Sequence, residues 1–163
     1  MPPPSFSERT RLDVPADYAF AFLADPSTAH VIDPAVTEYT PDSLPMQQGT
    51  RNVIRFRMWG IPLRVVSVVK EWQQGRRMVM ENVKPSWPVR AIATHSFVSD
   101  GDACTCTYTW AMEFRSSGPL GAIIGHAFAR FMHSNAEAQQ RLFKEEVERR
   151  FQHEHRAGGP ADT

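Results

Sequence analysis

The stretch SGPLGAIIGHAFARFMHSNAEAQQRLFKEEVERRF, residues 117–151, decides the fold of this chain. It contains no proline after Pro119, and its glycines lie near its start. At about 100° per residue, one side of a helix over this stretch collects Leu120, Ile124, Ala127, Phe128, Phe131, Ala138 and Leu142, with Ile123 at the margin. The stretch therefore predicts one long amphipathic helix, which needs a broad apolar surface to lie on. Asn135 interrupts this side, either as a helix-edge residue bonded to water or as an amide that lines a cavity.

Before this stretch, the apolar pattern changes its period twice. Residues 5–14 read as a strand, residues 15–24 as a short helix that opens at Pro15, and residues 27–33 as a second short helical turn. From residue 36 to 115 the period is two, which predicts strands over residues 36–39, 49–59, 61–72, 76–83, 87–98 and 103–114. The turns between these strands are short, so we expect an antiparallel meander.

The long helix is the only predicted element that can cover the apolar face of this sheet. The expected fold class is therefore α+β, in a helix-grip arrangement. A curved, seven-stranded antiparallel sheet wraps around the long C-terminal helix, and two short helices lie between the first and second strands. We expect a single domain over residues 5–151, with disordered tails at residues 1–4 and 156–163.

The composition is that of a soluble globular protein, with 42% hydrophobic and 22% charged residues in a chain of 163. The chain has no run of about 18 apolar residues, so we expect no membrane span. Its first residues, Met-Pro-Pro-Pro-Ser, lack the pattern of a secretory signal. Cys104 and Cys106 would share one strand face, which is poor geometry for a disulfide between them, so reduced thiols and a cytoplasmic location are expected.

The formal net charge is zero, but the charges are unevenly distributed. Residues 1–50 hold seven acids and two bases, residues 51–90 hold two acids and nine bases, and the remainder holds nine acids and seven bases. The central block has two interpretations: a solvated sheet face, or a surface that attracts an acidic protein partner. Nucleic acid is not an expected partner, and the chain could be a monomer or a homodimer.

Several local strings resemble the SRPBCC superfamily, which includes START domains, the birch-pollen-allergen fold and polyketide cyclase/dehydratase-like proteins. They are Val14-Pro15-Ala16-Asp17-Tyr18-Ala19-Phe20, Asp25-Pro26, Gly49-Thr50, Val69 to Trp72, His95-Ser96-Phe97 and Gly118-Pro119-Leu120-Gly121. The resemblance covers about residues 5–150 and implies a hydrophobic cavity between the sheet and the long helix. The superfamily has no single catalytic motif, so the resemblance carries over no catalytic residue.

Strand parity and the helix pattern predict which side chains line this cavity. The apolar set is Ile54, Phe56, Met58, Met78, Met80, Phe97, Trp110, Met112, Ile124, Phe128 and Phe131, and the amides are Asn52, Asn82 and Asn135. Each of these residues could equally be plain core. Together they suggest a pocket, because a curved sheet and one helix do not easily fill the concavity between them.

His95 and Tyr108 have inward parity on strands that we expect to be neighbours. They could serve as an acid–base pair, as dehydration or aldol-type ring closure requires, or His95 could be a core histidine bonded to Tyr108 or to the backbone. No cofactor is expected. No metal site is expected either, because Cys104, Cys106 and His95 lack a convincing fourth ligand.

Three functions follow from the sequence. The first is a module that binds a small hydrophobic molecule, whether lipid-like, aromatic or polyketide-like. The second is a polyketide cyclase/dehydratase-like enzyme that uses His95 and Tyr108. The third is an interaction protein whose basic residues 51–90 meet an acidic partner.

Overall fold

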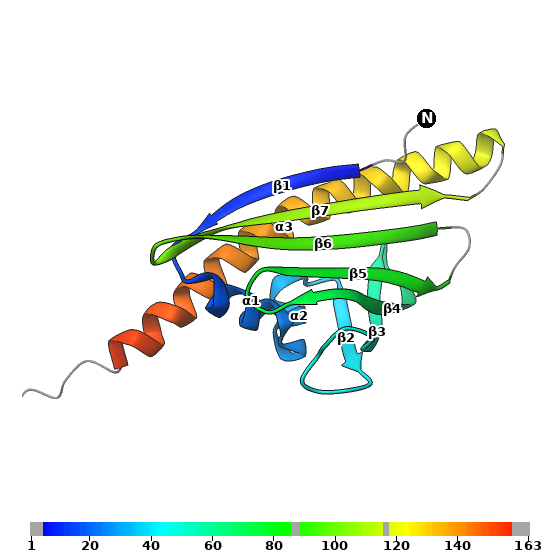
Figure 1. Ribbon diagram of the computed structural model, residues 1–163. Helices are drawn as coiled ribbons and strands as arrows, with labels where there is room; N and C mark the ends of the chain where they lie inside the picture. Colours follow the sequence, from blue (N-terminus) through cyan, green and yellow to red (C-terminus); the bar gives the residue numbers. More distant parts are fainter. Residues whose placement is uncertain (1–4, 86–88, 116–117, 158–163) are drawn as a thin grey trace, which may run out of the picture.

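The computed structural model describes residues 5–85, 89–115 and 118–157. Its element order is the expected one: a strand, three short helical segments, six further strands and one long helix (Figure 1). In chain order the elements are β1 Ser5–Leu12, α1 Ala16–Ala24, the 3₁₀ helix η1 Pro26–Thr28, α2 Ala29–Ile32, β2 Val36–Pro41, β3 Arg51–Met58, β4 Ile61–Gln73, β5 Arg77–Lys84, β6 Val89–Asp100, β7 Ala103–Phe114 and α3 Pro119–Ala157.

All seven strands form one antiparallel sheet in the order β1-β7-β6-β5-β4-β3-β2. The meander from β2 to β7 is sequential, and β1 adds to the open edge of β7. Register shifts interrupt the β2–β3 and β4–β5 pairings, and such irregularities bend a strand and increase its twist. The predicted seven-stranded helix-grip fold is therefore confirmed.

The connection from β1 to β2 is held by local hydrogen bonds. Pro15 caps the start of α1, as its fixed φ favours. The Asp25 carboxylate then accepts a hydrogen bond from the backbone of Ser27, and the Thr28 hydroxyl donates to the Phe22 and Asp25 carbonyls. This connection ends at Asp33, which caps the C-terminus of α2 and faces α3.

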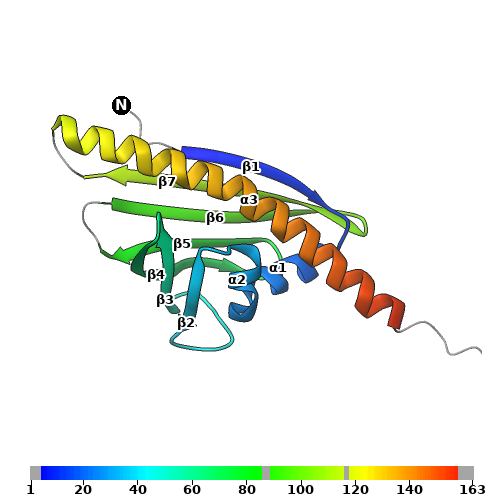
Figure 2. The same ribbon diagram turned by 180° about the vertical axis from the view of Figure 1, so that it is seen from behind.

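Helix α3 crosses one face of the sheet, and its C-terminal end extends beyond the strands (Figure 2). The side chains that it buries against the sheet differ from the predicted set. The buried positions are Gly121, Gly125, Ala136, Gln140, Phe143 and Val147. Leu120 and Ile123 are 70% and 67% exposed, so the predicted phase of the helix is wrong by about one residue.

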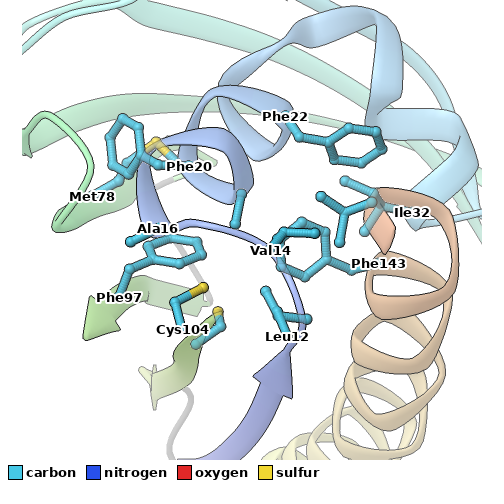
Figure 3. Packing of buried hydrophobic residues seen from close by; sticks show 13 residues of the cluster. Leu12, Val14, Ala16, Phe20, Phe22, Ile32, Met78, Phe97, Cys104 and Phe143 are labelled. Carbon is cyan, nitrogen blue, oxygen red and sulfur yellow. The ribbon is translucent and has the colours of Figure 1, made fainter. Parts of the chain in front are cut away.

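The main core lies at the end of the sheet where α1, β1 and the second half of α3 meet (Figure 3). Phe20, Phe97 and Phe143 pack there around Leu12 and Val14. Hydrogen bonds fix α3 at this end, because the Lys144 ammonium donates to the Arg11 carbonyl at 2.8 Å and the Asp13 amide donates to Glu148 at 2.9 Å. This end of the molecule therefore supplies the rigid support for the cavity described below.

Two predicted boundaries need correction or lie outside the described residues. The C-terminal tail cannot begin at residue 156, because Arg156 and Ala157 still belong to α3. The predicted tails at residues 1–4 and 158–163, the strand start at Trp87 and the helix opening at Ser117 lie outside the part of the chain that the structure describes. Among the described helices, none is both long and apolar enough to cross a membrane.

Candidate ligand-binding cavity

Beside the main core, the sheet and α3 enclose two adjoining chambers. The outer chamber has a volume of about 280 Å³ and apolar walls from β3, β4, β5, β6, β7 and α3. Its lining includes Leu63, Val65, Val89, Ala91, Trp110 and Phe128. The inner chamber has a volume of about 240 Å³ and lies toward α2 and β2. Five residues line both chambers, so the two adjoin: Ile54, Phe56, Met80, Ala93 and Met132.

The inner chamber differs from the outer one because polar side chains gather in it. They are Asp33, Tyr39, His95, Tyr108, Asn135, Gln139 and Gln140. Among the described residues, no lysine or arginine lines this chamber. The cavity therefore combines an apolar outer part with an inner part that carries hydrogen-bonding groups and one carboxylate.

Asp33 is held by donors on three sides. One carboxylate oxygen accepts a hydrogen bond from the backbone of Ala35 at 2.9 Å, and the other accepts from the side chains of Gln139 at 2.6 Å and Asn135 at 3.3 Å. Burial raises the pKa of Asp33, and these hydrogen bonds oppose the rise. Asp33 has no ion-pair partner among the described residues, so any charge on it faces the cavity uncompensated.

His95 and Tyr108 stand opposite each other on β6 and β7, and their rings stack with centroids 4.5 Å apart. Burial lowers the pKa of His95 to about 4, so its imidazole is neutral at pH 7. Burial, and then the charge of Asp33, raise the pKa of Tyr108, so its hydroxyl keeps its proton. The pair therefore offers a neutral imidazole and a phenol, which are one possible proton acceptor and one donor.

Three buried polar atoms near the cavity have no hydrogen-bond partner in the described part of the chain. They are His95 Nδ1, Asn52 Oδ1 and Ser67 Oγ. Ser67 lines the outer chamber and His95 the inner one. An unsatisfied buried polar atom costs about 1–3 kcal/mol, so a bound molecule that bonds these atoms would recover part of that cost.

Most of the residues predicted from strand parity do line the chambers. Ile54, Phe56, Met80, Asn82, Trp110 and Phe128 line the outer chamber, and Met78, His95, Tyr108, Phe131 and Asn135 line the inner one. The Asn82 amide holds the β5–β6 connection, since it donates to the carbonyls of Pro85 and Val89 and accepts from the Ala91 amide. Asn82 therefore shapes the wall of the outer chamber.

Five predicted residues lie elsewhere. Asn52 is fully buried behind Met80, toward whose sulfur its amide points at 3.8 Å. Phe97 belongs to the main core, and Met112 packs in a second cluster with Tyr108 and Trp110. Met58 lines neither chamber, because it sits at the end of β3 opposite Ile61. Ile124 is 50% exposed, because the true phase of α3 turns it away from the sheet.

The polar residues that sequence reasoning missed are Asp33, Tyr39, Gln139 and Gln140. Asp33 lies outside any periodic segment, where parity says nothing about direction. Gln139 and Gln140 lie on α3 on the side that the incorrect phase assigned to solvent. The inward residues of β4 (Leu63, Val65 and Ser67) could have been found, because they alternate along the strand like those of β3.

The basic block of residues 51–90 is partly neutralised in the fold. Arg55 pairs with Glu38 at 3.1 Å, Arg77 with Glu71 at 3.1 Å, and Arg90 with Glu81 at 2.8 Å. Away from the cavity, Glu8, His133 and Glu137 place ligand atoms within 4.8 Å of one another. His133 and Glu137 are exposed, and their 3.4 Å contact spans one turn of α3.

A curved antiparallel sheet that grips a long C-terminal helix, with a cavity between them, defines a helix-grip protein. Within this class, the chain belongs to the family described as Polyketide cyclase / dehydrase and lipid transport, whose model matches residues 3–148. A search of curated proteins finds no match to the chain.

Solved structures with the same fold share little sequence with the chain. The Zhui aromatase/cyclase from Streptomyces sp. R1128 has a TM-score of 0.77 and 16% identity over 90% of this chain and 94% of its own. TTHA0849 from Thermus thermophilus gives 0.72 and 16% over 88% and 97%. A START superfamily protein from Mycobacterium smegmatis gives 0.71 and 11% over 89% and 97%. These similarities establish the fold and the START/SRPBCC superfamily expected from the sequence.

Proposed function

We propose that this protein binds a small, uncharged, mostly apolar molecule in the cavity between the sheet and α3. The observation that carries the proposal is the junction of an apolar chamber and a polar one at Ala93 and Met80. The apolar body of the ligand would fill the outer chamber, and a hydroxyl or carbonyl group would reach Tyr108, His95 and the Asp33 cluster. The family description, which names polyketides and lipids, supports a ligand of this kind.

The charge of the ligand follows from the inner chamber. An anionic head group would face the carboxylate of Asp33, with no lysine or arginine among the described lining residues to offset it. Burying an unpaired charge costs several kcal/mol, whereas an uncharged group needs only hydrogen-bond partners. The proposal therefore favours a neutral alcohol, phenol or ketone over a carboxylic acid.

A pair of fluorescent probes tests this proposal. N-phenyl-1-naphthylamine is neutral, and 8-anilinonaphthalene-1-sulfonate is a close analogue that carries a sulfonate. The neutral probe should bind with enhanced fluorescence, and Ala93→Phe should abolish the enhancement, because the added ring occupies the junction of the two chambers.

The matched control is Thr94→Phe, which adds the same ring on the opposite face of β6. It should bind the neutral probe as the wild type does, and circular dichroism checks that both variants fold. Equal binding of the neutral probe by Ala93→Phe would rule out the cavity as the site. A sulfonate signal that Ala93→Phe removes would contradict the preference for uncharged ligands.

The stacked pair of His95 and Tyr108 favours a second candidate function, a cyclase/dehydratase-like enzyme. In this role the neutral His95 would accept a proton from the carbon next to a carbonyl, and the Tyr108 hydroxyl would donate a hydrogen bond to the carbonyl oxygen. A suitable substrate is a β-hydroxy ketone, whose dehydration yields a conjugated enone that absorbs in the ultraviolet.

His95→Gln and Tyr108→Phe should then each lower the dehydration rate by at least about a hundredfold, the usual contribution of a general acid or base. Both variants should still bind the neutral probe, which separates a loss of chemistry from a loss of the cavity. A dehydration rate that is unchanged in His95→Gln would leave the binding function alone.

A further inference from the structure

A large apolar surface lies outside the cavity, between the tip of the β3–β4 hairpin and the first half of α3. We call it the hairpin–helix surface and define it by Trp59, Ile61, Leu120, Ile123 and Ile124, which are 50–70% exposed. The Trp59 ring meets the Phe131 ring edge-on at 5.6 Å, so the two elements share one groove. Figure 2 shows the β3–β4 hairpin pointing toward α3. Monomeric proteins rarely leave such a contiguous patch without a partner.

The backbone at the hairpin tip indicates that Trp59 is not there for the sake of the turn. Trp59 has φ 51° and Gly60 has φ 79°, a pair of left-handed residues that Asn-Gly adopts most readily. A bulky residue in this conformation costs about 1–2 kcal/mol. The chain nevertheless holds an indole at the tip, where it is 62% exposed.

Both elements that border this surface carry bases and no acids. Residues 51–70 contain Arg51, Arg55, Arg57, Arg64 and Lys70, and residues 119–136 of α3 contain His126, Arg130 and His133. Within the described residues, no acidic side chain forms an ion pair with Arg57, Arg64 or Arg130. A partner for this surface must therefore be apolar and anionic at once.

We propose that the hairpin–helix surface docks peripherally on an anionic lipid bilayer. Aliphatic side chains and an exposed tryptophan suit the boundary between head groups and acyl chains, and each nearby arginine adds about 1 kcal/mol on an anionic leaflet. A second copy of the chain fits less well, because a symmetric contact would bring the arginines of both copies together with no acid between them. Docking would be peripheral, because no described helix qualifies as a membrane span.

Vesicle flotation tests the proposal. The wild type should float with vesicles that contain phosphatidylglycerol, bind phosphatidylcholine vesicles about tenfold less, and lose its binding at high salt. Trp59→Asn and Ile123→Ser should each weaken binding about tenfold, because each removes an apolar group worth about 1.5–3 kcal/mol when buried. Asparagine tolerates a left-handed backbone, so Trp59→Asn leaves the hairpin intact.

The matched control is Val98→Ser, because Val98 is 65% exposed on β6 near the β6–β7 turn, at the other end of the sheet (Figure 1). It should bind vesicles as the wild type does. Binding that is equal on both vesicle types, or that Trp59→Asn and Ile123→Ser leave unchanged, would overturn the proposal. So would a concentration-dependent dimer that Trp59→Asn abolishes, because the surface would then be covered by a second copy.

The docking proposal does not depend on the cavity proposal. Trp59→Asn should bind N-phenyl-1-naphthylamine as the wild type does, since Trp59 lines neither chamber. Ala93→Phe should float with anionic vesicles as the wild type does, since Ala93 lies inside the fold. Failure of one proposal therefore leaves the other open to its own test.

Discussion

His95 is the residue whose chemistry depends most on the fold. Its imidazole stacks on Tyr108 inside the molecule, and its Nδ1 atom is buried without a partner among the described residues. A charged imidazole there would have no nearby carboxylate in contact and little water, so the folded protein binds the proton poorly. The unfolded chain has no such restriction, because its histidine is solvated.

This difference predicts how stability depends on pH. The folded pKa of His95 is about 4, whereas the ordinary value is 6.5. Between these values the unfolded state binds more protons, so the free energy of unfolding falls as the pH falls from 6.5 to 4. The loss should total roughly 3 kcal/mol, at about 1.36 kcal/mol for each pKa unit.

Urea unfolding at several pH values measures this loss. The pH dependence should be weaker in His95→Gln than in the wild type by that amount. His153→Gln, which replaces an exposed histidine near the end of α3, should retain the full dependence. If the curves for His95→Gln and the wild type ran parallel, the buried imidazole would not be the cause.

At the scale of elements, α3 does two different things along its length. Its second half buries Phe143 and Val147 in the main core, and its first half exposes Ile123 and Ile124. The same helix thus stabilises the fold at one end and presents the hairpin–helix surface at the other.

A pair of substitutions separates these two roles. Phe143→Ala should cost about 3–5 kcal/mol of unfolding free energy, because it leaves a hole in the core beside Leu12 and Phe22. Ile124→Ala should change the stability by less than about 0.5 kcal/mol, because it removes an exposed side chain. Urea midpoints measure both, and a large loss in Ile124→Ala would restore the phase predicted from the sequence.

The elements show why the strands could be predicted and the phase of the helix could not. A strand has only two faces, so the arginines of β3 identify the outer face and Ile54 and Phe56 identify the inner one. The apolar residues of α3 are concentrated at Leu120, Ile123 and Ile124, which a second surface requires, and they pull the predicted phase away from the sheet. Asp33, which organises the inner chamber, lies between elements where no period applies.

The whole molecule is solid at one end and hollow at the other. The end with α1, β1 and the second half of α3 is filled by the main core. At the other end, β3, β4 and β5 curve away from α3, and the two chambers of about 280 and 240 Å³ lie between them. Sequence patterns predicted the concavity, but whether side chains would fill it depended on packing that periodicity does not describe.

The hollow end gives the protein a mechanical property that a filled core would not have. Hydrostatic pressure favours whichever state occupies the smaller volume, and unfolding eliminates internal voids. Compression should therefore loosen the region around β3–β5 first, while the packing around Phe143 resists. A molecule that fills the chambers would remove the lost volume and make the whole chain harder to compress.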